Sequence, residues 1–311
     1  MKNNVFLENL ESDMVRELKA YMETNHIKYS KDARDERILL DFIDNRKKWV
    51  LPRKRDVILS AELEDRIESH NFIKCGKTLG EQEALSIIKK FDYIRECIEN
   101  GRDINYHLSK KIFSSDEQQK DTLLNTWNVK HIHLSEYEAE SKSAMKRNRS
   151  DFLLFCIITN DSAYCIDILE HPKAAEFSMY RLMLIILRNG WSRKIGFMRN
   201  EDPNYIPDPL QPKIENDKDI TAIYQKCRFN MAFEFDGKMY MPFPQAAITC
   251  SGDNIYNVQC IFDFREICSQ YMDDGYTYDK MENFDIDNNK IIHMSLILRK
   301  DGKKYECRLE F

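Results

Sequence analysis

The stretch FLLFCIITNDSAYCIDILEH, residues 152–171, decides the fold of the middle of the chain. Residues 152–159 are a continuous apolar run rich in β-branched and aromatic side chains, which is typical of a buried strand. Residues 160–162, Asn-Asp-Ser, are a turn sequence, and residues 163–169 form a second apolar run of similar length. The stretch therefore predicts a β-hairpin.

The segments on either side of this hairpin extend it into a small α+β unit. Upstream, residues 129–134, Val-Lys-His-Ile-His-Leu, alternate so that both histidines share one face of a strand. Downstream, residues 173–189 are crowded with Leu and Ile and end at Asn189-Gly190, which predicts a helix buried on more than one side. We therefore expect an antiparallel β meander with one packed helix within residues 121–200.

The chain before this unit is predicted to be a helical domain, residues 1–120. Apolar residues recur at spacings of three and four in residues 7–22, 33–44 and 81–100. The last of these segments ends at Asn100-Gly101, a common signal for the end of a helix.

After residue 200 the sequence predicts a linker and a C-terminal region. Residues 201–217 contain four prolines and few apolar residues, which is typical of a Pro-rich linker. Residues 218–311 form an α+β region with two hairpins, one at Asp236-Gly237 and one at Lys300-Asp301-Gly302. The whole chain is therefore predicted to have an α+β fold.

The composition excludes several classes of protein. Glycine makes up about 3% of the 311 residues, against a usual level of roughly 7%, which excludes collagen and Gly-rich linkers. The formal net charge of −5 excludes a globally basic nucleic-acid binder but leaves room for a local basic patch. The nine cysteines include no CxxC spacing, so zinc ribbons and thioredoxin-type centres have no support. Because no apolar run approaches roughly 18 residues and no apolar signal core is present, we expect a cytoplasmic protein without a membrane partner.

Three histidines are the main candidates for chemistry. If the three strands pair in sequence order, the first and third are parallel, so His133 and His171 lie at the same end of the sheet, roughly 10 Å apart in backbone. Histidines there can act as general base and acid in the attack of a ribose 2′-hydroxyl on its phosphate. Alternatively, His131, His133 and His171 can hold a divalent metal with an open position for water. A structural role on one sheet face is the third interpretation.

Two basic segments are candidates for binding phosphate. Residues 141–149 contain no acidic residue and begin soon after the histidine strand; their basic side chains are Lys142, Lys146, Arg147 and Arg149. We expect them to lie near the imidazoles, where they can bind a phosphate. Residues 46–55 hold six basic residues and Trp49, which suits a nucleic-acid backbone. The alternative for residues 141–149 is a solvated loop, and the alternative for residues 46–55 is a charged helix end.

Two further motifs are too incomplete to predict a function. Gly76-Lys77-Thr78 has the ending of a phosphate-binding loop, but Asn71 occupies the position that requires a glycine. His293-Met-Ser295-Leu matches the signature that two-histidine phosphoesterases carry twice. The nearest second copy, His133-Leu-Ser135-Glu136, has a glutamate where the signature requires an apolar residue. We therefore expect no function from either motif.

The middle of the chain resembles a set of uncharacterised bacterial proteins that are often associated with mobile elements. The residues that carry this resemblance are Trp127–Leu134, Phe152–Phe155, Ile166-Asp167-Ile168 and His171. The order of helices followed by a three-stranded meander, over roughly residues 85–190, is also similar to the RelE-type ribonuclease toxins. That resemblance implies RNA as a partner, together with a toxin or phage-defence role and a protein partner such as an antitoxin.

These observations lead to one prediction of function with two alternatives. The chain is predicted to be a RelE-like endoribonuclease in which His133 is the base, His171 the acid and His131 an orienting residue or second base. Arg147 and Arg149 bind the phosphate in this prediction, and no cofactor is required, although a divalent metal is possible. The alternatives are a non-enzymatic adaptor that binds nucleic acid or protein, and a histidine–metal-dependent hydrolase.

Overall fold

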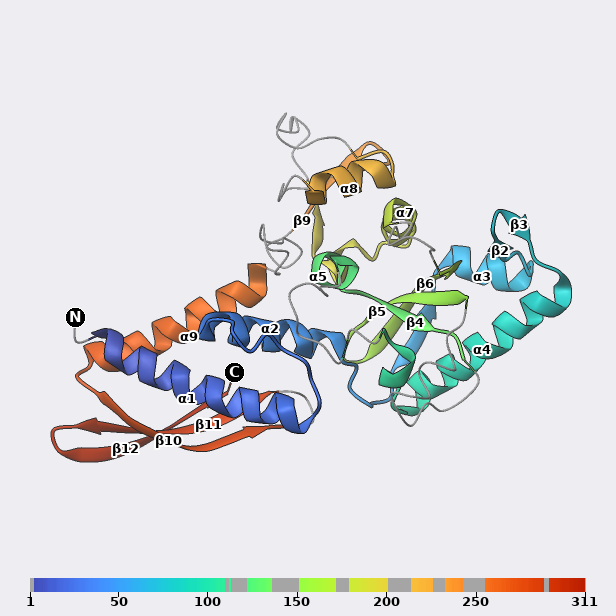
Figure 1. Ribbon diagram of the computed structural model, residues 1–311. Helices are drawn as coiled ribbons and strands as arrows, with labels where there is room; N and C mark the ends of the chain where they lie inside the picture. Colours follow the sequence, from blue (N-terminus) through green and yellow to red (C-terminus); the bar gives the residue numbers. More distant parts are fainter. Residues whose placement is uncertain are drawn as a thin grey trace. The chain divides into compact units, whose positions relative to one another are not determined.

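The computed structural model describes residues 3–109, 112, 122–135, 151–171, 179–200, 214–225, 233–242, 255–287 and 291–310 (Figure 1). Contacts divide the chain into two units. One unit combines Met1–Leu51 with Tyr256–Phe311, and the other combines Pro52–Ile112 with Asp121–Ile255. Helices and several antiparallel sheets occur in the chain, so the predicted α+β class is confirmed.

The first unit packs helices against a three-stranded sheet. The sheet has the order β10-β11-β12 and is antiparallel throughout. Its strands are β10 (Thr277–Ile286), β11 (Ile292–Lys300) and β12 (Lys303–Glu310), and its helices are α1 (Asn3–Thr24), α2 (Asp35–Lys48) and α9 (Ile255–Asp273). Helix α1 packs on α2 and on β10 (Figure 1). The predicted hairpin at residues 300–302 is confirmed as the turn between β11 and β12.

This unit joins the two ends of the chain, which the sequence analysis placed in separate domains. Its core consists of buried apolar residues from both ends of the chain, among them Leu10, Met14, Leu18, Ile38, Phe42, Phe264, Cys268, Met294, Leu296 and Leu298. The grouping therefore differs from the predicted helical domain 1–120 and C-terminal region 218–311. A helical period identifies the apolar face of a helix, but it does not identify the surface that covers this face.

The second unit contains the predicted meander. Strands β4 (Val129–His133), β5 (Phe152–Ile158) and β6 (Ser162–Glu170) pair antiparallel in sequence order. A fourth strand that the sequence did not predict, β1 (Asp56–Leu59), pairs parallel with β6 and gives the sheet order β1-β6-β5-β4. Strands β4 and β5 are buried along almost their whole length, as expected of a sheet covered on both faces.

Helix α7 (Met179–Arg188) packs on this sheet, as predicted. Its apolar residues join one core with residues from the strands, including Trp127, Val129, Leu153, Phe155, Ile157, Ile166, Leu182, Ile185 and Ile186. The first part of the predicted helix, residues 173–178, lies outside the described residues. The helix ends at Gly190, whose amide donates to the Leu187 carbonyl.

Helix α4 and a small hairpin complete the surroundings of the sheet. Helix α4 (Glu81–Asn100) has the predicted bounds and ends at Gly101 with a left-handed φ of 71°. Before it come α3 (Ala61–Glu68) and the short strands β2 (Ile73–Lys74) and β3 (Lys77–Thr78). Ser60 caps α3, because its hydroxyl accepts the Leu63 amide at 3.0 Å.

The remaining elements of the second unit are short. They are η1 (Asn105–His107), α5 (Thr122–Trp127), η4 (Ser192–Ile195), β7 (Phe197–Arg199), α8 (Asp217–Gln225), β8 (Phe233–Phe235) and β9 (Lys238–Pro242). The predicted hairpin at Asp236-Gly237 joins β8 and β9. Most of the predicted Pro-rich linker, residues 201–213, lies outside the described residues. Within the described part of the chain, no helix has the length and apolarity needed to cross a membrane.

Candidate active site

The end of the four-stranded sheet brings together the three histidines that the sequence singled out. His133 is the last residue of β4, and His171 directly follows β6. Their rings lie 5.6 Å apart between centroids, with an angle of 27° between the planes. The His131 ring lies 6.4 Å from that of His133. The sheet order makes this possible, because parallel strands β4 and β6 end at the same edge.

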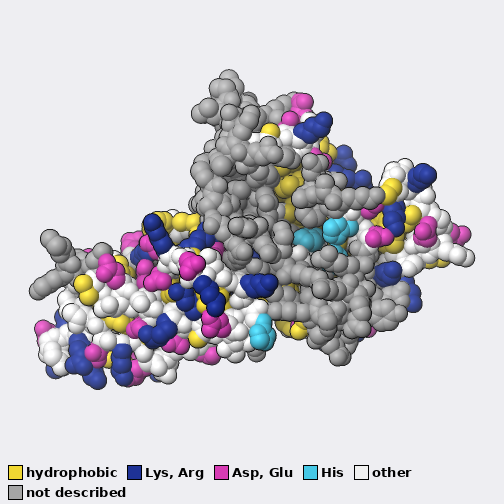
Figure 2. All heavy atoms as spheres, viewed as in Figure 1, with side chains coloured by type: hydrophobic (Ala, Val, Ile, Leu, Met, Phe, Trp, Pro, Cys, Tyr) yellow, Lys and Arg dark blue, Asp and Glu magenta, His cyan; other side chains and the backbone are white. Residues whose placement is uncertain are grey.

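The three imidazoles differ in their access to solvent. His131 and His133 are each 8% exposed, whereas His171 is exposed. Pairing places His131 opposite Phe155 and His133 opposite Leu153, and both apolar partners belong to the core beneath α7. Figure 2 shows histidine side chains grouped at the molecular surface. The cluster therefore borders the apolar core on one side and water on the other.

His171 reaches this cluster through the start of β5. Its backbone amide donates to the Asp151 carbonyl at 2.6 Å, immediately before β5 begins at Phe152. Strand β5 lies between the two histidine strands, as predicted. The side chains of His133 and His171 nevertheless reach each other across it.

A fourth histidine that the sequence did not single out supports His133. His107 lies on η1 and is only 4% exposed. Burial lowers the pKa of His107, and this outweighs a hydrogen bond to the His133 backbone and the charge of Asp103, which both raise the pKa. Its ring also lies 6.0 Å from that of Tyr93 on α4. His107 thus contacts the end of β4 through the backbone of His133.

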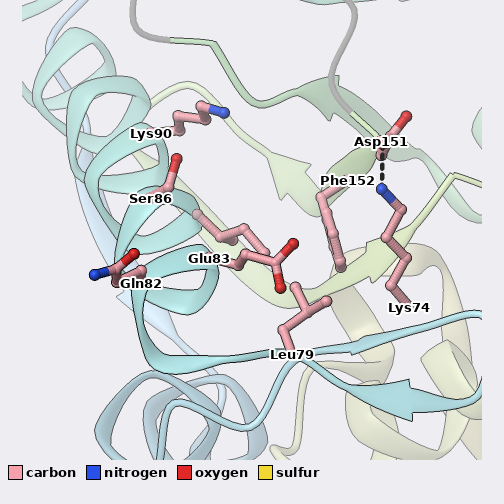
Figure 3. Close-up of a pocket in the computed structure, with 9 residues that line it drawn as sticks. Lys74, Leu79, Gln82, Glu83, Ser86, Lys90, Asp151 and Phe152 are labelled. Carbon is pink, nitrogen blue, oxygen red and sulfur yellow. Dashed lines mark hydrogen bonds and ion pairs between the residues drawn. The ribbon is translucent and has the colours of Figure 1, made fainter.

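A polar pocket of about 430 Å³ lies between α4, the β2–β3 hairpin and the start of β5, on the face of the sheet opposite to His131 and His133 (Figure 3). It is lined by Lys74, Leu79, Gln82, Glu83, Ser86, Ile87, Lys90, Asp151 and Phe152. The Lys74 Nζ atom lies 2.6 Å from Asp151 Oδ2. The hydrogen bond from Lys74 is the main cause of a lowered pKa of Asp151, and the nearby His171 and Lys90 lower it further.

Asp151 connects the pocket with the histidines. Its side chain lines the pocket, and its backbone carbonyl accepts the amide of His171. Because Phe152 and Leu153 alternate along β5, the pocket faces α4, whereas His133, opposite Leu153, faces the core with α7. The candidate active site is therefore the histidine cluster, and Asp151 is its backbone link to the pocket.

The predicted phosphate-binding residues are only partly placed. Lys142, Lys146, Arg147 and Arg149 lie outside the described residues. The basic run at 46–55 is divided, because residues 46–48 end α2 in the first unit and residues 53–55 precede β1 in the second. Burial lowers the pKa of Lys47 to about 8, and Arg55 donates from Nε to the Thr159 carbonyl at 2.7 Å. These contacts favour the structural interpretation of this run.

A buried carboxylate on β6 is another feature that sequence reasoning did not identify as part of the site. Asp167 is fully buried, accepts hydrogen bonds from Arg66 Nε at 2.7 Å and Nη2 at 3.1 Å, and pairs with Arg181 Nη2 at 2.9 Å. Arg66 lies on α3 and Arg181 on α7. The carboxylate therefore ties two helices to the strand that ends at His171.

The two incomplete motifs have structural roles. Gly76-Lys77-Thr78 forms the turn and second strand of the β2–β3 hairpin, not a loop that opens a helix. His293 lies on β11 in the first unit, with its ring nitrogens 3.5 Å from Asp287 Oδ2 and 3.3 Å from Glu310 Oε1. Neither belongs to the histidine cluster.

Among the described residues, no group of three or more histidine, cysteine or carboxylate side chains has the arrangement needed to hold a metal ion. No family model, curated protein or solved structure matches the chain.

Proposed function

We propose that the chain is an endoribonuclease in which His133 and His171 transfer protons. The observation that supports this is the pair of imidazoles 5.6 Å apart at one end of the sheet. In this reaction the base removes a proton from a ribose 2′-hydroxyl, whose oxygen attacks the adjacent phosphorus. The acid protonates the departing 5′-oxygen, so the products carry a 2′,3′-cyclic phosphate and a 5′-hydroxyl.

The different exposure of the two imidazoles supports the assignment of roles. The buried His133 borders the apolar core, and the proposal assigns to it the removal of the 2′-hydroxyl proton. The exposed His171 faces solvent, and the proposal assigns to it the protonation of the departing 5′-oxygen. His131 borders His133 on the same strand and orients it, while His107 fixes the strand end.

RNA as the substrate requires cations close to the imidazole pair, because negative charge develops on the phosphate during the attack. In the proposal Arg147 and Arg149 bind this phosphate, and they are candidates from their place in the sequence soon after the histidine strand.

The wider role proposed for this activity is that of a toxin or phage-defence ribonuclease. A metal-independent ribonuclease needs only RNA and is hazardous to the cell that makes it. An inhibitory protein partner is part of the proposal for that reason, with a bacterial cytoplasm as the place of action.

Cleavage of a mixed RNA pool tests the proposal. The pool is incubated with the full chain, with and without EDTA, beside His133→Ala, His171→Ala and the control His293→Ala. General acid–base groups contribute about 10²–10⁴ in rate, so we expect EDTA-resistant cleavage that falls at least about 100-fold in the first two variants and is unchanged in the control. Cleavage abolished by EDTA would favour a metal-dependent hydrolase, and tight RNA binding without cleavage would favour an adaptor.

A further inference from the structure

We propose that Arg181, in the first turn of α7, binds the phosphate on which the histidine pair acts, and that Asp167 orients it. The assignment rests on the proposed ribonuclease function and adds a described residue to Arg147 and Arg149. Three observations support it: the face of the sheet over which Arg181 lies, the positive charge of its surroundings, and its exposure to solvent.

Strand pairing places Asp167 on the same face of the sheet as the histidines. Pairing aligns His131 with Phe155, and Phe155 with Asp167, so these three residues form one row across β4, β5 and β6. Residues of one row project to the same face. His133 lies one row nearer to the end of the sheet, opposite Leu153. Asp167 therefore projects toward α7, on the side that carries both histidines of β4.

The start of α7 lies over this part of the sheet. Met179 and Tyr180 pack against the core cluster that contains Leu153 and Phe155. Next to them, Arg181 Nη2 donates to Asp167 Oδ2 at 2.9 Å.

The distance from Asp167 to His133 is one that side chains and a phosphate can span. Their backbones are separated by two strand spacings across the sheet and two residues along it, roughly 12 Å. The same two strand spacings separate His133 from His171, and their rings nevertheless lie 5.6 Å apart. Side chains on this face therefore converge at the end of the sheet.

The buried carboxylate needs only one of its two arginines. Arg66 donates to Asp167 from Nε at 2.7 Å and from Nη2 at 3.1 Å, and its Nη1 donates to the Asn71 carbonyl at 2.8 Å. Arg66 therefore neutralises Asp167 by itself. Because Arg181 joins the same carboxylate, the group carries one excess positive charge, which an anionic ligand would balance.

Arg181 is the arginine of this group that a ligand can reach. Its side chain is 47% exposed, against 10% for Arg66. Nη2 holds Asp167, and within the described part of the chain Nε and Nη1 have no hydrogen-bond partner. A guanidinium group presents paired N–H donors that match two phosphate oxygens, and a carboxylate behind it fixes its orientation.

The role of Arg181 in the proposed reaction is electrostatic. As the 2′-oxygen attacks phosphorus, negative charge grows on the two phosphate oxygens that are not bridging, and Arg181 donates hydrogen bonds to them. Its guanidinium group stays protonated throughout, so the two histidines carry all proton transfer.

Cleavage kinetics of Arg181→Ala and Arg181→Lys test the inference. Loss of one donor to developing charge costs about 10²–10³ in rate, so we expect Arg181→Ala to lower kcat/KM at least about 100-fold. Arg181→Lys should retain more activity, because it keeps the charge and loses the paired donors. Guanidinium ion, added well below denaturing concentrations, should restore part of the activity of Arg181→Ala, which a purely structural role would not allow.

Arg188→Ala is the matched control. Arg188 lies about two turns further along α7. Its side chain is 54% exposed and pairs with Glu62 at 3.4 Å. We expect this variant to cleave RNA as the unchanged chain does.

Binding of RNA with a 2′-O-methyl group on every sugar separates this inference from the ribonuclease proposal, since such RNA has no 2′-hydroxyl to attack. Arg181→Ala should reduce the slope of log K against log salt concentration by about 1, the effect of one lost phosphate contact, and Arg188→Ala should not.

Unchanged cleavage and binding in Arg181→Ala, or equal losses in Arg188→Ala, would overturn the inference. Loss of activity that accompanies unfolding and that guanidinium ion does not restore would also overturn it. RNA cleavage that depends on His133 but not on Arg181 would overturn it and leave the ribonuclease proposal intact. Binding that depends on Arg181, without RNA cleavage by the unchanged chain, would support the phosphate contact and overturn the ribonuclease proposal alone.

Discussion

Asp167 is a single residue whose charge the surrounding fold must balance. It is fully buried, and two arginines from α3 and α7 neutralise it. Arg66 is itself only 10% exposed in its side chain, whereas Arg181 is 47% exposed. A buried ion pair is costly to break on one side only, because the remaining charge has neither partner nor water.

We therefore expect Asp167→Asn to lower the free energy of unfolding by about 3–5 kcal/mol, since it leaves Arg66 buried without its counter-charge. Arg181→Ala is the comparison, and we expect about 0–1 kcal/mol because that arginine lies largely in water. Urea denaturation of both variants measures the difference. Equal losses in the two variants would contradict this account of Asp167.

The sequence predicted the site residues that follow from strand geometry and missed those that follow from packing. His131 and His133 share a face because strand residues two apart do so, and His171 joined them once the strand order was assumed. His107 gave no such signal. Its role depends on where η1 packs relative to the sheet, and no local pattern contains that information.

Gly101 and Gly190 end α4 and α7 in the same left-handed conformation but in different surroundings. Their φ angles are 71° and 69°. A Cβ atom at Gly101 would lie 2.7 Å from the Lys54 backbone nitrogen and 2.8 Å from the Arg53 carbonyl carbon, whereas one at Gly190 would meet nothing within 4 Å. A substitution at Gly190 therefore introduces backbone strain alone, whereas one at Gly101 introduces backbone strain together with a steric clash.

We expect Gly190→Ala to cost about 1–2 kcal/mol, the penalty of the left-handed conformation. Gly101→Ala should cost a further 1–3 kcal/mol or so, because the backbone before β1 must move. Thermal or urea unfolding of the two variants gives the comparison. A Gly101→Ala protein as stable as Gly190→Ala would show that the chain at residues 53–54 does not pack against this helix end.

Helices and strands could be predicted where the local sequence pattern is long and distinct. The hairpin of β5 and β6 and the bounds of α4 followed from long apolar runs and from Asn-Gly at the helix end. Strand β1 was missed, because it has only four residues and follows a basic segment. Its partner β6 lies more than a hundred residues later, so the pairing that creates it is not visible locally.

For the whole molecule, the two units show why domain boundaries could not be read from the sequence. The first unit takes α1 and α2 from one end of the chain and α9 with its sheet from the other. The second unit lies between them in sequence and carries the histidine cluster. The composition does not change at residue 51 or 255, where the units meet. The sequence analysis divided the chain by the type of predicted element, and it therefore placed the boundaries after residues 120, 200 and 217.

The central claim is that the histidine pair cleaves RNA through the 2′-hydroxyl. The most direct test is analysis of the ends produced by the full chain on a defined RNA, beside the same RNA with a 2′-deoxy sugar at the cut position. The account predicts 2′,3′-cyclic phosphate and 5′-hydroxyl ends, and no cleavage at the deoxy position. Products with 5′-phosphate and 3′-hydroxyl ends, or cleavage at the deoxy position, would contradict it.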